Sequence, residues 1–319
     1  MPAKTAWVLT DDKAGMITQA VGLAEAVGLP FEGKIIRLRP PWAWLPPRLW
    51  PGGVMGLAPD SDALTPPWPD LVISCGRKAI GPARAVKRRS GGRTFQVYIQ
   101  NPHIPLRAFD LVVAGAHDRL SGDNVVTTKG ALHRVTAARL CDAAREFAPS
   151  LAALPRPLTA VLVGGPNGVY RMTPEITADF ADRLAAFAGQ TGGGLAITPS
   201  RRTGAQNEGV LRERLAGRST VIWDGAGRNP YFGYLALADQ IVVTCDSVSM
   251  VSEACATGKP VHVFDLPGGN AKFERFHSLL RDQGITRPFT GSPAHWTYPP
   301  FDDTARIGAE IRTRMGLSQ

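Results

Sequence analysis

Short apolar runs alternate with helix-like segments along nearly the whole chain, and this alternation is the feature that most constrains the fold. Runs such as AWVLT (6–10), DLVISCG (70–76) and QIVVTCD (240–246) are continuously apolar, which is typical of strands buried on both faces. Segments with helical patterning separate them. We therefore expect an α/β fold with mostly parallel sheets covered by helices on both faces.

The alternation falls into two series, and this predicts two domains. The proline-rich stretch PSLAALPRP (149–157) separates the series, and 319 residues are enough for two cores. We expect a Rossmann-like domain over residues 1–150, a second one over 151–300, and a last helix at 302–315 that packs back on the first. The strands expected in the two series are 6–10, 34–38, 70–76, 94–100, 110–115 and 124–128, then 159–165, 194–200, 219–225, 240–246 and 261–266.

Net charge narrows the choice of partners. The formal charge of +9 favours an anionic partner: a nucleotide, an acidic lipid surface or nucleic acid. The chain has no zinc-finger spacing and no RNP-like aromatic signature, so nucleic acid is not expected. The four cysteines lack CxxC spacing and are expected to be buried thiols rather than metal ligands. No apolar run approaches the length of a membrane helix and no signal-peptide core precedes the first strand, which favours a cytoplasmic protein.

Polar residues follow several of the expected strands, where ligands bind in open parallel sheets. GGPNG supplies Gly164, Gly165, Asn167 and Gly168 after the strand at 159–165. Its amides and the following helix favour a diphosphate, although a tight turn is the alternative. GGPNG is neither GxGxxG nor GxxxxGK[ST], so the sequence does not predict a dinucleotide or Walker-type loop.

Two further loops of the second series carry candidate ligand contacts. Arg201 and Arg202 follow the strand at 194–200 and could bind phosphate oxygens, or could be ordinary surface arginines. Asn229 and Tyr231 lie before the strand at 240–246. Tyr231 or Phe232 could cover a base or fill the core.

The stretch TCDSVSMVSEACATGKPVHVF (244–264) contains the most specific cluster. Asp246, Ser247 and Ser249 are candidate nucleotide contacts, although helix capping alone would also explain Asp246 and Ser247. Glu253 lies four residues after Ser249, so the two share a helical face. A carboxylate at this position could accept both hydroxyl hydrogens of a ribose.

Candidate residues in the first domain also follow strands. Asp11 or Asp12 could act as a base toward an acceptor, with Lys13 balancing phosphate charge, or the aspartates could simply cap the first helix. His117 and Asp118 are further catalytic candidates of this domain, although a lone histidine is more often structural. Gln100 and Asn101 are candidate contacts for the acceptor or its phosphate.

The segment RPPWAWLPPRLWPGGVMG (39–56) combines three tryptophans with arginine and proline. Tryptophan beside arginine suits a lipid headgroup region. The alternative is a proline-rich loop folded over its own domain.

Taken together, these motifs resemble a known family. DSVSMVSEACATGKPVHVF is similar to the nucleotide-binding region of GT-B glycosyltransferases. With GGPNG, NPYF and TDDKAGMITQAVGLAEA, the chain resembles the bacterial branch of the mitochondrial-fission Elm-type family. The resemblance implies a GT-B-like fold with two Rossmann-like domains facing a central cleft. Where the family often has a histidine, this chain has Met16, which weakens a histidine base there.

The resemblance also implies a function. We expect a glycosyltransferase-like enzyme that takes a nucleoside diphosphate sugar as co-substrate, with no bound cofactor and, lacking a DxD-type triplet, no metal. A lipid-linked or cell-envelope glycan is the expected acceptor, with the protein cytoplasmic or peripheral on the inner membrane. The alternatives are a nucleotide-sugar epimerase on the same fold and a non-catalytic scaffold at membranes.

Overall fold

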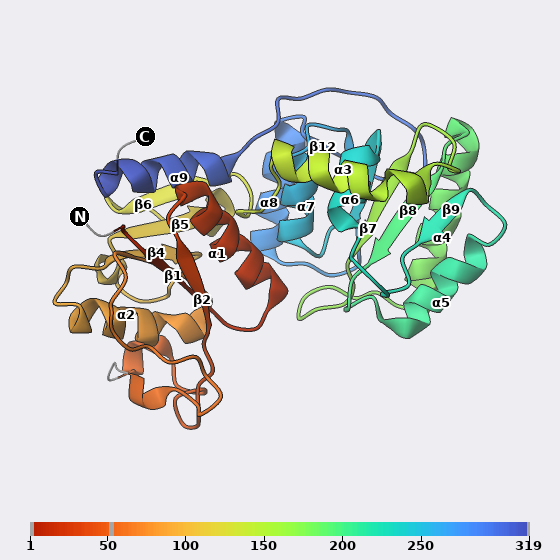
Figure 1. Ribbon diagram of the computed structural model, residues 1–319. Coiled ribbons are helices and arrows are strands. Elements are labelled where there is room, and N and C mark those ends of the chain that lie inside the picture. Colours follow the sequence, from red (N-terminus) through yellow and green to blue (C-terminus); the bar gives the residue numbers. More distant parts are fainter. Residues whose placement is uncertain (1–2, 51–53, 318–319) are drawn as a thin grey trace. The chain divides into compact units, whose positions relative to one another are not determined.

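The computed structural model describes residues 3–50 and 54–317, and the chain divides into two compact units (Figure 1). Unit 1 consists of Met1–Arg134 and Asp302–Gln319, and unit 2 of Val135–Phe301. The division lies before helix α3 (Ala137–Leu151) rather than at 150/151, because α3 packs along α6 (Tyr231–Leu237) of unit 2. Helix α9 (Asp303–Arg314) packs on α1 (Ala14–Val27) of unit 1.

Unit 1 contains a six-stranded parallel sheet in the order β2-β1-β3-β4-β5-β6. Its second strand covers 31–35 and not the expected 34–38, because this part pairs with β1 as an exposed edge while Ile36 turns into the core. The strands are β1 Ala6–Thr10, β2 Phe31–Ile35, β3 Leu71–Cys75, β4 Phe95–Ile99, β5 Leu111–Gly115 and β6 Val125–Thr128.

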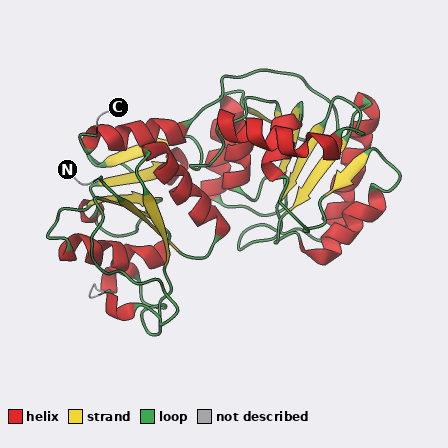
Figure 2. Ribbon diagram, viewed as in Figure 1, coloured by secondary structure: helices red, strands yellow, loops and turns green. Residues whose placement is uncertain are grey.

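Helices cover both faces of this sheet (Figure 2). Because strand residues alternate between faces, Val8 packs in a cluster with α1 and α9, whereas Trp7 and Leu9 pack in a second cluster with α2 (Ile80–Arg89). Short 3₁₀ turns complete the unit: η1 Pro47–Leu49, η2 Val54–Gly56, η3 Arg77–Ala79, η4 Leu106–Ala108 and η5 Ala116–Asp118.

Unit 2 contains a second six-stranded parallel sheet, in the order β12-β11-β10-β7-β8-β9. Its strands are β7 Thr159–Val163, β8 Leu195–Pro199, β9 Thr220–Ile222, β10 Gln240–Thr244, β11 Val261–Phe264 and β12 Thr286–Pro288. Besides α3 and α6 it contains α4 Pro174–Thr191, α5 Gly204–Arg214, α7 Val248–Cys255 and α8 Ala271–Asp282. The sequence did not predict α8 and β12, although Asn270 caps α8 by accepting the N–H groups of Lys272 and Phe273.

Both sheets have the same kind of topological switch point. In unit 1 the chain leaves the neighbouring strands β1 and β3 toward opposite sides of the sheet, and in unit 2 it does so at β7 and β10. Crevices open at such points, outside the carboxyl ends of the two strands. The topology therefore singles out the loops after β1 and β3, and those after β7 and β10.

Replacing each of two helical glycines by alanine tests how closely the helices pack. An alanine Cβ at Gly308 in α9 would lie 2.8 Å from Cβ of Ala26 in α1, whereas at Gly209 in α5 it would meet nothing within 4 Å. Gly209→Ala should therefore raise the free energy of unfolding by about 0.5–1 kcal/mol through helix propensity. Gly308→Ala should lower it by about 1–3 kcal/mol through overpacking.

Urea unfolding of both full-length variants, followed by circular dichroism, measures these changes. Equal stabilisation by the two substitutions would contradict the close packing of α9 on α1.

Candidate functional site

The carboxylate of Asp246 joins the loops at the switch point of unit 2. One oxygen accepts from the Thr244 hydroxyl at 2.6 Å; the other accepts from the Gly165 amide at 3.1 Å and lies 2.6 Å from the Arg202 guanidinium. The residue is buried. Asp246 thus links the ends of β7, β8 and β10 and does not cap α7, so the sequence-based explanation by capping is wrong for this residue.

The GGPNG loop is held tightly by the same contacts. The amide of Gly164 donates to the Thr244 hydroxyl, so the amides of both Gly164 and Gly165 are engaged inside the unit. A Cβ at Gly165 would lie 2.2 Å from the carbonyl oxygen of Arg202, which explains glycine there, while one at Gly168 would meet nothing within 4 Å. Asn167 is also engaged: its side chain accepts from two loop amides and donates to the Asp246 carbonyl.

The two arginines after β8 differ in their surroundings. Arg202 is bound to Asp246 and to the Gly165 carbonyl at 2.9 Å. Arg201 is exposed and has no ion-pair partner among the described residues. Of the two, Arg201 is the one available to an anion.

Helix α7 begins at this edge of the sheet. Ser247 is its N-cap and accepts from the Met250 amide at 3.3 Å, as expected from capping. Ser249 is half-buried in the first turn, one helical turn before Glu253. The amino end of α7 therefore lies beside the switch point with polar side chains around it.

Glu253 is buried, which differs from the exposed carboxylate that a ligand contact suggests. The side chain is 6% exposed, and Oε2 accepts from the Tyr231 hydroxyl at 2.6 Å. Oε1 accepts no hydrogen bond within the described part of the chain, and it is not among the buried unpartnered atoms there, so it keeps contact with solvent. Burial raises the pKa of Glu253 to about 7, although the hydrogen bond from Tyr231 opposes the shift.

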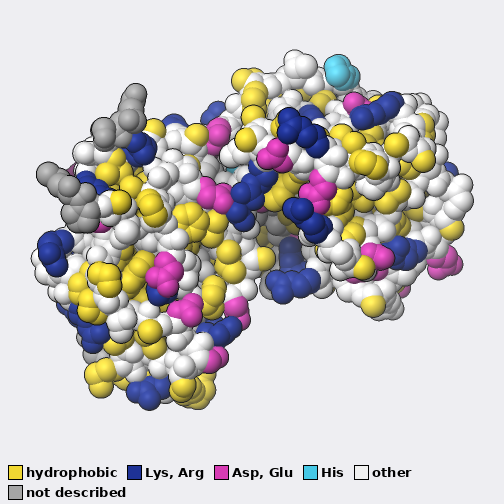
Figure 3. Space-filling view, in the orientation of Figure 1, with side chains coloured by type: hydrophobic (Ala, Val, Ile, Leu, Met, Phe, Trp, Pro, Cys, Tyr) yellow, Lys and Arg dark blue, Asp and Glu magenta, His cyan; other side chains and the backbone are white. Residues whose placement is uncertain are grey.

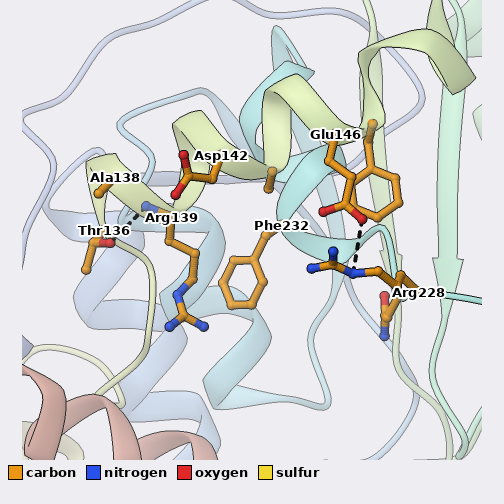
Figure 4. A pocket seen from close by; sticks show the side chains of 10 residues that line it. Thr136, Ala138, Arg139, Asp142, Glu146, Arg228 and Phe232 are labelled. Atoms are coloured by element: carbon orange, nitrogen blue, oxygen red, sulfur yellow. Dashed lines mark hydrogen bonds and ion pairs between the residues drawn. The ribbon is translucent and has the colours of Figure 1, made fainter.

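A groove of about 450 Å³ lies between α3 and the start of α6, and its lining includes Phe232, the next residue after Tyr231 (Figure 4). Tyr231 points to Glu253, while the next residue, Phe232, lies in the groove with the Arg139 guanidinium 5.4 Å from its ring centre. Arg228 pairs with Glu146 at 3.0 Å on the other side. Asn229 also lines the groove, and its side chain caps α6 by accepting from the Tyr231 amide.

Lys259 is a residue whose role the sequence did not indicate. In GKP its ammonium donates to the carbonyls of Leu235 and Ala236, at 2.6 and 2.5 Å, at the carboxyl end of α6. Burial lowers its pKa to about 8. The lysine thus satisfies the last carbonyls of the helix that carries Tyr231, and it is not directed to a phosphate.

At the switch point of unit 1, Asp11 follows β1 and is buried, with its carboxylate 3.7 Å from the position of a Cβ on Gly76 after β3. The Met16 sulfur lies 3.3 Å from both the Cys75 thiol and the Gln100 amide. Gln100 has a φ of 86°, a backbone conformation that residues other than glycine rarely adopt. The structure thus brings Asp11, Gln100 and the Met16 position together.

The other candidates of unit 1 differ in their burial and contacts. Asp12 and Lys13 are exposed, with the Lys13 ammonium 3.7 Å from Asp11. Asn101 accepts from the His103 amide and forms a turn. His117, which is buried after β5, lies 3.9 Å from the Asp118 carboxylate.

Within residues 3–50 and 54–317, Cys75, Cys245 and Cys255 are buried as expected, whereas Cys141 is exposed, so the expectation of a buried thiol is wrong for this residue. No group of three or more His, Cys, Asp or Glu in these ranges could hold a metal ion. No helix there is long and apolar enough to cross a membrane.

Comparison with known sequences identifies the family. The family model described as mitochondrial fission ELM1 matches residues 14–315. The chain belongs to this family. The mitochondrial fission protein ELM1 of Arabidopsis thaliana is 36% identical over 274 residues, which cover 77% of this chain and 64% of the plant protein. The match thus spans less than two thirds of the plant protein's length.

Solved structures show which fold this ELM1-family chain adopts. The UDP-GlcNAc 2-epimerase of Methanocaldococcus jannaschii, in complex with UDP-GlcNAc and UDP, has a TM-score of 0.56 at 10% identity over 98% of this chain and 99% of its own. Phytolacca americana UGT2, complexed with UDP-2fluoro-glucose and pterostilbene, has a TM-score of 0.51 at 9% identity over 100% and 91%. The prediction of an α/β, GT-B-like fold with two Rossmann-like units is confirmed.

The raised pKa of Glu253 predicts a pH-dependent stability. The folded pKa of about 7 lies above the ordinary value of 4.5, so folding takes up a proton between these values and stability falls as the pH rises through this window. The loss is at most about 1.4 kcal/mol per pH unit. Glu253→Gln keeps an acceptor for Tyr231 and should lack this loss.

Urea unfolding of the wild type and Glu253→Gln at pH 5, 6, 7 and 8 measures the difference. Glu213→Gln, at an exposed carboxylate of α5, is the control and should follow the wild type. Parallel curves for wild type and Glu253→Gln would show that Glu253 titrates normally.

Proposed function

We propose that unit 2 binds a nucleoside diphosphate sugar and that the protein is a glycosyltransferase. The observation that carries the proposal is the Glu253 carboxylate, whose Oε2 is held by Tyr231 while Oε1 has no protein partner among the described residues. Oε1 is not one of the fully buried unpartnered atoms, so it can accept a hydrogen bond from a ligand. The GT-B-like fold and the sugar nucleotides bound by proteins of similar fold support the choice of ligand.

In this proposal, Glu253 accepts hydrogen bonds from the ribose. Tyr231 occupies Oε2 and fixes the carboxylate, leaving Oε1 for a ribose hydroxyl. Ser249, one turn earlier on α7, is placed to contact the same sugar. Because the ionised carboxylate is the better acceptor, nucleotide affinity should fall as the pH drops below 7.

The diphosphate is assigned to the amino end of α7 and to Arg201. The amides of Gly164 and Gly165 are engaged within the unit, so they are removed from the phosphate contacts that the sequence suggested. The dipole of α7 favours a negative charge at its first turn, and Arg201 can add a bidentate contact. Arg202 is assigned to holding the loops, through its pairing with Asp246.

The base is assigned to the start of α6. Asn229 offers an amide, and the Phe232 ring with the Arg139 guanidinium forms a surface on which a planar base could stack. During transfer, the diphosphate leaves with its charge stabilised by Arg201 and α7.

For the acceptor base we propose the group at the switch point of unit 1, with Asp11 or Asp12 accepting the hydroxyl proton. A lipid-linked or cell-envelope glycan is the proposed acceptor.

A nucleotide-sugar epimerase is the second candidate. It is favoured by the likeness of fold to UDP-GlcNAc 2-epimerase. A non-catalytic scaffold is the third, suggested by the description of the family as mitochondrial fission proteins.

Nucleotide binding by Glu253 variants tests the site. Titration calorimetry with UDP, GDP, ADP and CDP should find one that binds. Glu253→Gln should weaken it about tenfold, the difference between a charged and a neutral acceptor of about 1–2 kcal/mol. Glu253→Ala should weaken it further while the unit stays folded, and Glu213→Ala should bind as the wild type does. Unchanged affinity in both Glu253 variants would remove the carboxylate from the site.

The products of the matching nucleotide sugar separate the candidate functions. A transferase releases the nucleoside diphosphate only with an acceptor, whereas an epimerase forms a second sugar nucleotide without one. Failure of every nucleoside diphosphate and sugar nucleotide to bind would support the scaffold and contradict the proposal.

A further inference from the structure

Three large apolar side chains project to solvent from one segment of unit 1. Among the described residues, the large hydrophobic side chains classed as exposed are Phe31, Trp44, Leu49 and Met55. Trp44, Leu49 and Met55 are 75%, 59% and 76% exposed and fall within residues 39–56. Residues 51–53 of this segment lie outside the described residues.

The other two tryptophans of the segment anchor it to the unit. Trp42 and Trp50 pack edge to face, 6.3 Å apart, and the Trp50 indole donates to the Trp42 carbonyl at 3.0 Å. Trp50 lies against α2 where a Cβ on Gly81 would be 1.9 Å from its ring, and Trp42 lies similarly against Gly56. The segment is thus fixed by two inward tryptophans while Trp44 points outward.

Arginines fix the backbone beside the exposed side chains. Arg39 donates twice to the Met55 carbonyl, at 2.8 and 3.1 Å, and Arg77 donates to the Ala43 carbonyl, next to Trp44, at 2.8 Å. Trp44 and Met55 therefore project from a backbone that is held in place. Holding an apolar side chain in water costs free energy, so exposed side chains grouped in this way indicate a contact with a partner.

The positive charge of the protein is concentrated around this segment. Residues 37–109 contain 11 of the 36 Lys and Arg and 3 of the 27 Asp and Glu, of which Asp60 pairs with Arg37. The remaining chain has 25 basic and 24 acidic residues, an excess of one positive charge. The range 37–109 includes Arg77 and α2, which contact the segment directly. In Figure 3, Lys and Arg side chains lie beside hydrophobic ones at the end of unit 1 that this segment forms in Figure 1.

We propose that Trp44, Leu49 and Met55, with the described residues 39–50 and 54–56 around them, dock unit 1 on an anionic lipid membrane. Trp44, Leu49 and Met55 would enter the boundary between headgroups and acyl chains, and the surrounding arginines and lysines would contact the lipid phosphates. This charge and apolar pattern complements a bilayer surface. A nucleic acid would use the basic residues but would gain nothing from exposed Leu49 and Met55.

Vesicle co-sedimentation of the full-length protein tests the proposal, with pure phosphatidylcholine vesicles and vesicles containing about one third phosphatidylglycerol. We expect binding to the anionic vesicles, weaker binding at 0.5 M salt through screening, and little binding to phosphatidylcholine alone. The variant Trp44→Ala, Leu49→Ser, Met55→Ser should bind at least about tenfold more weakly. Because these side chains are exposed, its thermal unfolding should match the wild type.

Two control variants distinguish membrane docking from other kinds of binding. Phe31→Ala removes an exposed aromatic outside the segment and should bind as the wild type does. Replacement of Arg48, Arg88 and Arg89 by glutamate should abolish binding. Loss in this charge variant with full binding by the apolar variant would assign the surface to a phosphate polymer such as RNA and overturn the proposal, as would equal binding by all variants. Neither result depends on nucleotide binding in unit 2.

Discussion

The buried carboxylate of Asp246 organises the carboxyl edge of the second sheet. It accepts from Thr244 after β10, from the Gly165 amide after β7 and from the Arg202 guanidinium after β8. These contacts are charge-assisted and the carboxylate itself is shielded from water, although Arg202 is partly exposed. Removing the carboxylate would leave a buried amide and hydroxyl unpaired. The positions of α7 and the GGPNG loop both depend on this one group.

The candidate site is defined by the polar groups that make no hydrogen bond or ion pair with the neighbouring loops. The amides of Gly164 and Gly165 and the guanidinium of Arg202 serve the fold. Oε1 of Glu253 and Arg201 remain for a ligand. Tyr231 joins the site to α6, whose carboxyl end Lys259 satisfies. A ligand here would therefore meet a scaffold whose polar groups are already oriented, which lowers the entropy cost of binding.

The sequence predicted the α/β class because buried parallel strands are continuously apolar, a local signal. The sequence predicted a domain boundary after α3 from a proline-rich stretch, which is a local signal. The structure puts the boundary before α3 because α3 packs on α6, and this contact joins segments far apart in the chain. Glu253 was found from its spacing to Ser249. Its burial and its bond to Tyr231, 22 residues away, depend on tertiary structure, as do the contacts of Asp246 with Gly165, 81 residues away. Composition alone also could not distinguish Trp42 and Trp50, which pack inward, from Trp44, which points to solvent.

A crystal structure of the protein with a bound nucleoside diphosphate tests the proposed site most directly. We expect a ribose hydroxyl within hydrogen-bonding distance of Oε1 of Glu253, a diphosphate at the amino end of α7 near Arg201, and an Asp246–Arg202 pair that stays intact. A nucleotide bound away from α7, or one whose phosphates displace Asp246 from Arg202, would contradict the proposed site.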